Sequence, residues 1–373
     1  MLRKGTFILM KTKIQDMTSG SPGRLIILFA IPLMLGNICQ QLYTMVDTMV
    51  VGQVAGVEAL AALGAVDFLM WVVTGISTGL TQGFSIQLSQ YYGAKDFENL
   101  RKSLAHSYRL TAFIAIGVFI LSQSFASLVL TGLHTPSNII GMSLLYLRII
   151  FCGIPATAAY NMFASALRAM GNSKTPLTAM IIASVLNVSL DILFVAGFGW
   201  GVAGAAIATV IAQSFSAVYC FLILRRIDIV HLTRADFMPA SGMNARLMKL
   251  GIPVVFQNII IGVGGLVVQY VINGYGFLFV AGFTATNKLY GLLEMAAISY
   301  GYAIVTYVGQ NLGAGKIDRI RKGVRSSMLL SLLTSLIISA AMFLFGKNIL
   351  SLFISGEPQQ TQQVLAKIGR AHV

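Results

Sequence analysis

Four acidic side chains lie deep within long apolar segments of this chain of 373 residues. If such segments cross a membrane, each buried ionisable group costs at least about 2.5–3.5 kcal/mol. Such groups therefore persist mostly where they line a cavity or bind an ion. The candidates are Asp47, Asp67, Asp191 and Glu294.

Asp191 has the most informative surroundings. Asn187 precedes it by four residues, so both side chains share one helix face. Thr209, in the next apolar segment, could approach that face. A carboxylate, an amide oxygen and a hydroxyl are hard oxygen ligands, which suit Na⁺ or a proton held by hydrogen bonds.

Asp47 continues a polar stripe on an otherwise apolar segment, because Gln40 and Tyr43 precede it at helical spacing. Two carboxylates brought together in a medium of low dielectric cannot both stay ionised easily, which is what a proton-operated switch requires. For Na⁺ coupling, Asp47, Asn187 and Asp191 would be the metal ligands. The alternative is that both aspartates are held in structural hydrogen bonds.

Asp67 and Glu294 are weaker candidates. Either could line a cavity, but Asp67 could equally make hydrogen bonds that hold helices together. Prolines interrupt three apolar segments, and each removes a backbone donor and can bend its helix. Pro32 is the expected hinge beside the cation site; the other two are Pro155 and Pro253.

The elements that must position these residues are membrane-spanning helices. Hydrophobic residues make up 56% of the chain, charged residues only 10%, and the mean hydropathy is +0.80. Soluble domains carry about 25% charged residues, and a helix needs about 20 apolar residues to cross a bilayer. The fold class expected is an all-α polytopic membrane protein with nine spans. They lie at 25–51, 57–91, 104–131, 139–166, 175–196, 201–224, 247–273, 277–311 and 323–346.

Basic residues gather in alternate connections between the spans. Their distribution predicts a multi-pass protein of the cell (inner) membrane with a cytoplasmic N-terminus, because cytoplasmic loops are enriched in Lys and Arg. The net charge of +14 is therefore interpreted as a topology signal, and no nucleic-acid partner is expected. The three cysteines and four histidines show no spacing typical of a metal site.

The chain also resembles itself at an offset of about 220 residues. Pro32 and Asn37 match Pro253 and Asn258, while Gln90 and Gly93 match Gln310 and Gly313. Six spans separate the copies, so both should enter the membrane in the same direction, related by an axis along the membrane normal. The expected organisation is a cytoplasmic segment 1–24, an N-lobe 25–224, a cytoplasmic linker 225–246 and an incomplete C-lobe 247–367.

The second copy ends after three spans, and a tenth span would begin near Gln359. Residues 368–373 are interpreted as a non-native tail on a truncated chain, and no transport is expected without spans ten to twelve.

Several motifs resemble the multidrug and toxic compound extrusion (MATE) family. They are the stretches 29–34, 40–43 and 46–52 in the first span, 167–176 after the fourth and 309–315 after the eighth, and the similarity runs over residues 16–365. The resemblance implies a two-lobe bundle of twelve helices. It also implies export of organic cations or other amphipathic drugs in exchange for H⁺ or Na⁺, with no cofactor and no enzymatic activity.

The resemblance further implies a cation pocket in the N-lobe. At the matching positions this chain has Pro32, Asp47, Tyr146, Asn161, Asn187, Asp191 and Thr209. Ala164 replaces a pocket asparagine of some members, and span 247–273 lacks the acid that others carry.

Two other functions are alternatives to drug export. A flippase for lipid-linked precursors needs a strongly basic cavity, whereas few basic residues lie within spans; they are Arg109, Arg148 and Lys288. A membrane enzyme would need clustered His and Asp residues near one membrane interface, and the sequence shows no such cluster. The expected partners are a small-molecule substrate and the lipid bilayer, and the protein is expected to be a monomer.

Overall fold

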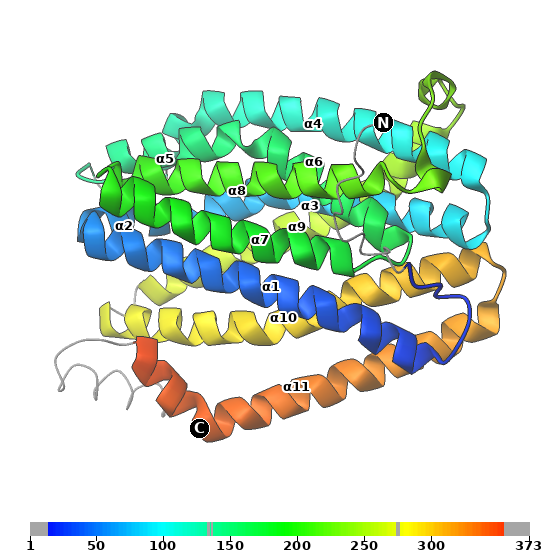
Figure 1. Cartoon of the computed structure of the whole chain (residues 1–373). Coiled ribbons are helices and arrows are strands. Elements are labelled where there is room, and N and C mark those ends of the chain that lie inside the picture. The colour runs from blue at the N-terminus through cyan, green and yellow to red at the C-terminus, as the bar shows by residue number, and fades with distance from the viewer. Residues whose placement is uncertain (1–13, 133–134, 136, 274–276, 354–373) are drawn as a thin grey trace, which may run out of the picture.

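The computed structural model describes residues 14–132, 135, 137–273 and 277–353. Within these ranges the chain forms helices and no strand, so the all-α fold class is confirmed. Figure 1 shows the long helices running side by side in one bundle. They are α1 (Pro22–Val54), α2 (Val57–Gly64), α3 (Asp67–Gly93), α4 (Phe97–Gly132), α5 (Ile140–Cys152), α6 (Ile154–Ala169), α7 (Lys174–Asp191), α8 (Gly201–Leu224), α9 (Met243–Asn273), α10 (Phe277–Gly313) and α11 (Ile317–Phe353).

Large apolar side chains cover the outside of this bundle. Phe343 of α11 is 89% exposed and Phe113 of α4 is 77% exposed, whereas Asp191, Ser143 and Gln310 are fully buried. Such a surface cannot face water, but it suits hydrocarbon. Among the described residues, seven helices are long and apolar enough to cross a membrane, or eight if the bent pair α5–α6 is one span.

Two of the nine expected spans are not single helices. The span expected at 57–91 is divided into α2 and α3. The span expected at 139–166 forms α5 and α6, which meet at an angle of 46°. Pro155 is in the first turn of α6, where its missing N–H needs no partner. Pro32 and Pro253, in contrast, lie inside the uninterrupted helices α1 and α9.

Helices of the two lobes make reciprocal contacts. A Cβ added to Gly93 of α3 would overlap the backbone of Gln310 in α10, and one added to Gly313 would overlap the backbone of Gln90. The sequence repeat pairs these same positions. Two units related by a twofold axis exchange contacts in this way, so the packing agrees with the parallel repeat.

The basic connections gather at one end of the bundle, at the right of Figure 1. There an N-terminal segment, residues 14–20, joins the α6–α7 turn to the start of α11. The Gln15 amide donates to the Gly171 carbonyl (3.1 Å), and the Met17 amide donates to Gln310 Oε1 (3.0 Å). Arg319 donates to the Gly20 carbonyl (2.9 Å). This segment therefore ties the lobes together at that end.

Gln310→Ala should release the N-terminal segment. Gln310 also donates to the Ala169 carbonyl (2.8 Å), so the change leaves two buried backbone groups without partners. Each costs about 1–3 kcal/mol. We expect faster amide hydrogen exchange at Met17, read by mass spectrometry. The control is Gln90→Ala, the repeat-related position; unchanged exchange in Gln310→Ala would contradict the prediction.

Candidate cation-coupling site

Three helices position the cluster around Asp191. Asp191 is the last residue of α7, and Asn187 lies one turn earlier; both are 0% exposed. Helix α7 packs against α1 and α8. The Asn187 amide donates to Thr209 Oγ1 of α8 (3.4 Å), as the spacing of these residues suggested.

A π-helix, Ile192–Gly197, follows Asp191 directly. The wider turn is visible in the bond from the Phe198 amide to the Leu193 carbonyl (2.9 Å). Single π-turns inside α-helices occur frequently at functional sites. The expected span 175–196 gave no sign of it, because the apolar run continues without interruption.

Asp47 approaches this cluster from α1. Its side chain is 5% exposed, and the carboxylates of Asp47 and Asp191 are close enough to interact electrostatically. Tyr43, one turn earlier on α1, and Tyr146 of α5 are buried within the field of both acids. The structure therefore places the two aspartates that the sequence singled out within electrostatic range of each other.

Several buried oxygen atoms of this cluster accept no hydrogen bond from the described residues. They are Oδ1 of Asp47, Oδ1 of Asn187 and both carboxylate oxygens of Asp191. A buried polar atom without a partner costs about 1–3 kcal/mol, and more if it is charged. These oxygens are hard donors, so the set fits a proton or Na⁺.

The remaining predicted residues make other contacts or are exposed. Asn161 of α6 is half-buried and donates to Thr78 of α3 (3.2 Å). Pro32 is buried four turns before Asp47 on α1, about 22 Å along the axis. Three candidates have exposed side chains and stay predictions for a cavity lining: Gln40, Asp67, which interacts electrostatically with Asp47, and Glu294.

Gln213 of α8 is a member of the cluster that the sequence analysis missed. It donates to the Tyr43 hydroxyl (3.3 Å), while its own Oε1 is buried without a partner in the described structure. Gln213 follows Thr209 by one helical turn, so the two share a face of α8. This spacing from Thr209 is the feature of the sequence that could have indicated Gln213.

Within the described residues, no group of three or more His, Cys, Asp and Glu side chains could hold a metal ion. The candidate donors are therefore the mixed set of carboxylate, amide and hydroxyl oxygens around Asp191. Such a set contains few charges, which is typical of sites that release their cation readily.

Long apolar helices that run side by side, with acidic side chains buried among them, indicate a multi-pass membrane protein. The MatE family model matches residues 32–193 and 253–368, and the chain belongs to this family. Similar proteins include the probable multidrug resistance protein YpnP of Bacillus subtilis (strain 168). It is 32% identical over 343 residues, which are 92% of this chain and 77% of that protein.

Further similar proteins extend the comparison. The probable multidrug resistance protein NorM of Thermotoga maritima is 25% identical over 339 residues, which are 90% of this chain and 72% of that protein. A solved MOP superfamily transporter from Pyrococcus furiosus superposes with a TM-score of 0.89 at 23% identity, covering 96% of this chain and 79% of that one. The expected MATE fold is thereby confirmed.

Proposed function

We propose that this protein is a secondary active antiporter that exports drugs or other amphipathic or cationic small molecules in exchange for H⁺ or Na⁺. The observation that carries the proposal is the cluster of buried, unpartnered oxygens on Asp47, Asn187 and Asp191. Burying such groups is costly unless they bind something during the working cycle. The names of YpnP and NorM as multidrug resistance proteins support a drug as the cargo.

In this mechanism a cation arriving at Asp47 and Asp191 cancels one of their two negative charges. The two carboxylates then no longer repel each other, so α1 and α7 can pack differently, and α1 can bend at Pro32, where one backbone hydrogen bond is missing. The rearrangement reshapes the cargo cavity and lowers its affinity for the drug. Gln213 and Tyr43 join α8 to α1 and would transmit the movement.

The driving force is adequate for export. One proton moving down about 100 mV supplies about 2.3 kcal/mol, and one unit of pH difference adds about 1.4 kcal/mol. With one-to-one coupling, the total supports a gradient of several hundredfold for an uncharged drug, since each 1.4 kcal/mol is a factor of ten. For a singly charged cationic drug the two charge movements cancel, so the pH difference alone supports a gradient of about tenfold.

We further propose that the protein lies in the cell membrane as a monomer, with its N-terminus in the cytoplasm. The N-terminal segment and the connections rich in Lys and Arg gather at one end of the bundle (Figure 1). Cytoplasmic loops carry such an excess of positive charge.

Dye efflux from proteoliposomes tests the proposal. A version extended to the twelve spans that the family implies is reconstituted, and a pH or Na⁺ gradient is imposed in turn. We expect one gradient to drive efflux of a cationic dye and the other to leave it at the background rate. Equal efflux with and without gradients would contradict antiport, whereas transport of a lipid-linked diphosphate instead of dye would indicate a flippase.

A further inference from the structure

Two cavities lie next to each other on the outer side of α4, α6 and α8, away from the carboxylate cluster. The first has a volume of about 360 Å³ and the second about 340 Å³. Tyr108 and Phe221 line both cavities, so the two form one elongated site. Their combined size is within the range that binds an organic ligand.

Aromatic rings mark the boundary between the cavities. Tyr108 of α4 meets Phe163 of α6 edge to face at 5.3 Å, and Phe163 meets Phe221 of α8 at the same distance. Because α6 packs against both α4 and α8, these rings connect all three helices. A packed floor of this kind keeps the shape of the site fixed.

The first cavity combines apolar side chains with two basic residues. Arg225 and His231, at the start of the linker after α8, line it together with the Tyr108 ring. The His231 Nε2–H donates to the Arg225 carbonyl (2.9 Å), while the Arg225 guanidinium has no bond or ion pair within the described structure. Of the linker's two acids, Asp236 is engaged by Thr233 and Arg101, and the exposed Asp228 forms no ion pair with Arg225 or His231 within the described structure. The positive charge at this cavity is therefore available to a ligand.

The second cavity is almost entirely apolar. Besides Tyr108, Thr111 contributes a hydroxyl; it is 7% exposed and has no hydrogen-bond partner in the part of the chain described. The other lining residues include Ala112, Ile116, Ala159 and Met162. This cavity suits a hydrocarbon chain, and the hydroxyl can donate to an ester carbonyl at its beginning.

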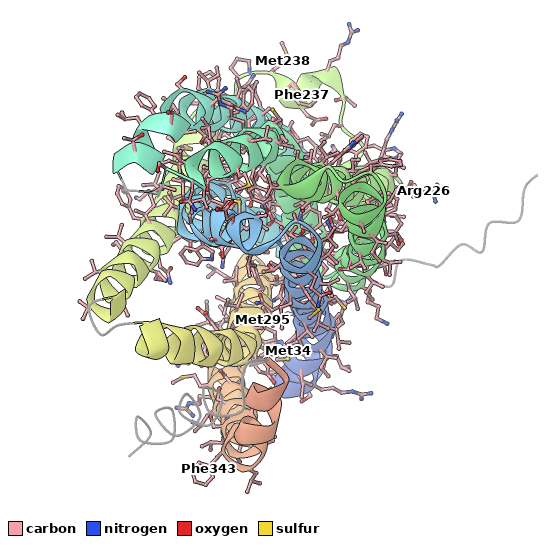
Figure 2. The ribbon with its side chains drawn as sticks, turned by 90° about the vertical axis from the view of Figure 1, so that its left-hand side faces the viewer. Met34, Arg226, Phe237, Met238, Met295 and Phe343 are labelled. Atoms are coloured by element: carbon pink, nitrogen blue, oxygen red, sulfur yellow. The ribbon has the colours of Figure 1, made fainter. Side chains whose placement is uncertain are left out.

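The joined site lies where a lipid would meet it. Ile116 lines the second cavity and is 54% exposed on the lipid-facing side of α4, next to Phe113. The first cavity lies at the basic end of the bundle, where α8 ends and the linker begins. Figure 2 shows Phe237 and Met238 of the linker projecting outward beyond α4, and both are exposed. Exposed apolar residues beside arginines are typical of a membrane interface.

We propose that these cavities bind one anionic phospholipid, with its phosphate at Arg225 and His231 and one acyl chain between α4, α6 and α8. Basic pockets at the ends of membrane helices bind acidic head groups in this way. A zwitterionic lipid would add a cation beside Arg225, so it should bind less well. The proposal is independent of the proposed antiport, because none of these residues belongs to the carboxylate cluster.

Native mass spectrometry of the delipidated chain tests this proposal. The protein is mixed with equal amounts of phosphatidylglycerol and phosphatidylcholine that carry the same acyl chains. We expect one retained phosphatidylglycerol per chain. Arg225→Gln should weaken that binding about fivefold, since one basic residue near an anionic lipid contributes about 1 kcal/mol, and Arg225→Lys should retain most of it.

Arg226→Gln is the matched control. Arg226 carries the same charge one residue later, but it does not line either cavity and lies at the outer edge of the bundle (Figure 2). It should leave the affinity unchanged. If Arg225→Gln and Arg226→Gln weaken lipid binding equally, the effect comes from general surface charge and the proposed site is wrong. The proposal also fails if the unmodified chain retains phosphatidylglycerol and phosphatidylcholine equally.

Two further experiments distinguish lipid binding from binding of free phosphate. Ala159→Phe fills the apolar cavity and should release the lipid, whereas millimolar inorganic phosphate should not displace it. Displacement by phosphate alone would mean that the basic cavity takes a free anion, and the lipid proposal would fail. Melting temperatures in lipid-free detergent show whether each variant is folded, and the Arg225 series decides the outcome if Ala159→Phe is not.

Discussion

Replacing Asp191 with asparagine should reduce gradient-driven efflux to the background rate. The change keeps the shape of the side chain but removes the titratable group, so the site can no longer alternate between charged and neutral forms. Efflux should then no longer depend on the imposed gradient, because the coupling energy is lost. The measurement is dye efflux from proteoliposomes under an imposed gradient, with the twelve-span version.

The control for this experiment is Asp228→Asn, the same chemical change at an exposed position of the linker. It should transport normally. Asp47→Asn should act like Asp191→Asn, and the double variant should be no worse than either single variant, because residues that act as a unit are not additive. Full gradient-driven export by Asp191→Asn would refute the assignment.

Gly313→Leu should prevent the two lobes from closing at the end that holds the N-terminal segment. At this position α10 runs directly against α3, and even a Cβ would overlap the Gln90 backbone. Backbone cannot move aside as a flexible side chain can, so the cost should reach or exceed the ~3 kcal/mol typical of severe overpacking. Gly93→Leu should have a similar effect, because it makes the reciprocal contact with Gln310.

The lowered stability would appear as a lower midpoint of thermal unfolding in detergent. Gly301→Leu is a suitable control on the same helix, since a Cβ there meets no atom within 4 Å. If Gly313→Leu and Gly301→Leu unfold at the same temperature, the close approach of α3 and α10 does not limit the packing of the lobes.

The sequence was informative where the membrane makes polar residues expensive. Asp47 and Asp191 stood out because little else in their spans is charged, and the structure places them together. Asn187 could be added because helical spacing places it on the same face as Asp191, and Thr209 because the next span could approach that face. The repeat predicts that Gly93 and Gly313 have equivalent surroundings, but it does not predict how closely the two helices approach each other there.

Other features leave no mark in composition or spacing. The π-helix after Asp191 depends on how α7 packs, and its six residues are as apolar as those of any regular span. Gln213 was overlooked because glutamine is uncharged, so hydropathy gives it little weight. The bonds that hold the N-terminal segment involve mainly backbone groups, such as those of Met17 and Gly20, which any residue would offer.

Those bonds bear on how readily the protein could change shape. Residues 14–20 close this end of the bundle with a handful of hydrogen bonds and with the side chain of Met17, which is fully buried in a hydrophobic cluster. Each hydrogen bond contributes about 0.5–1.5 kcal/mol net. Under the proposed antiport, detaching this segment would require work of the same order as the energy that one incoming ion supplies.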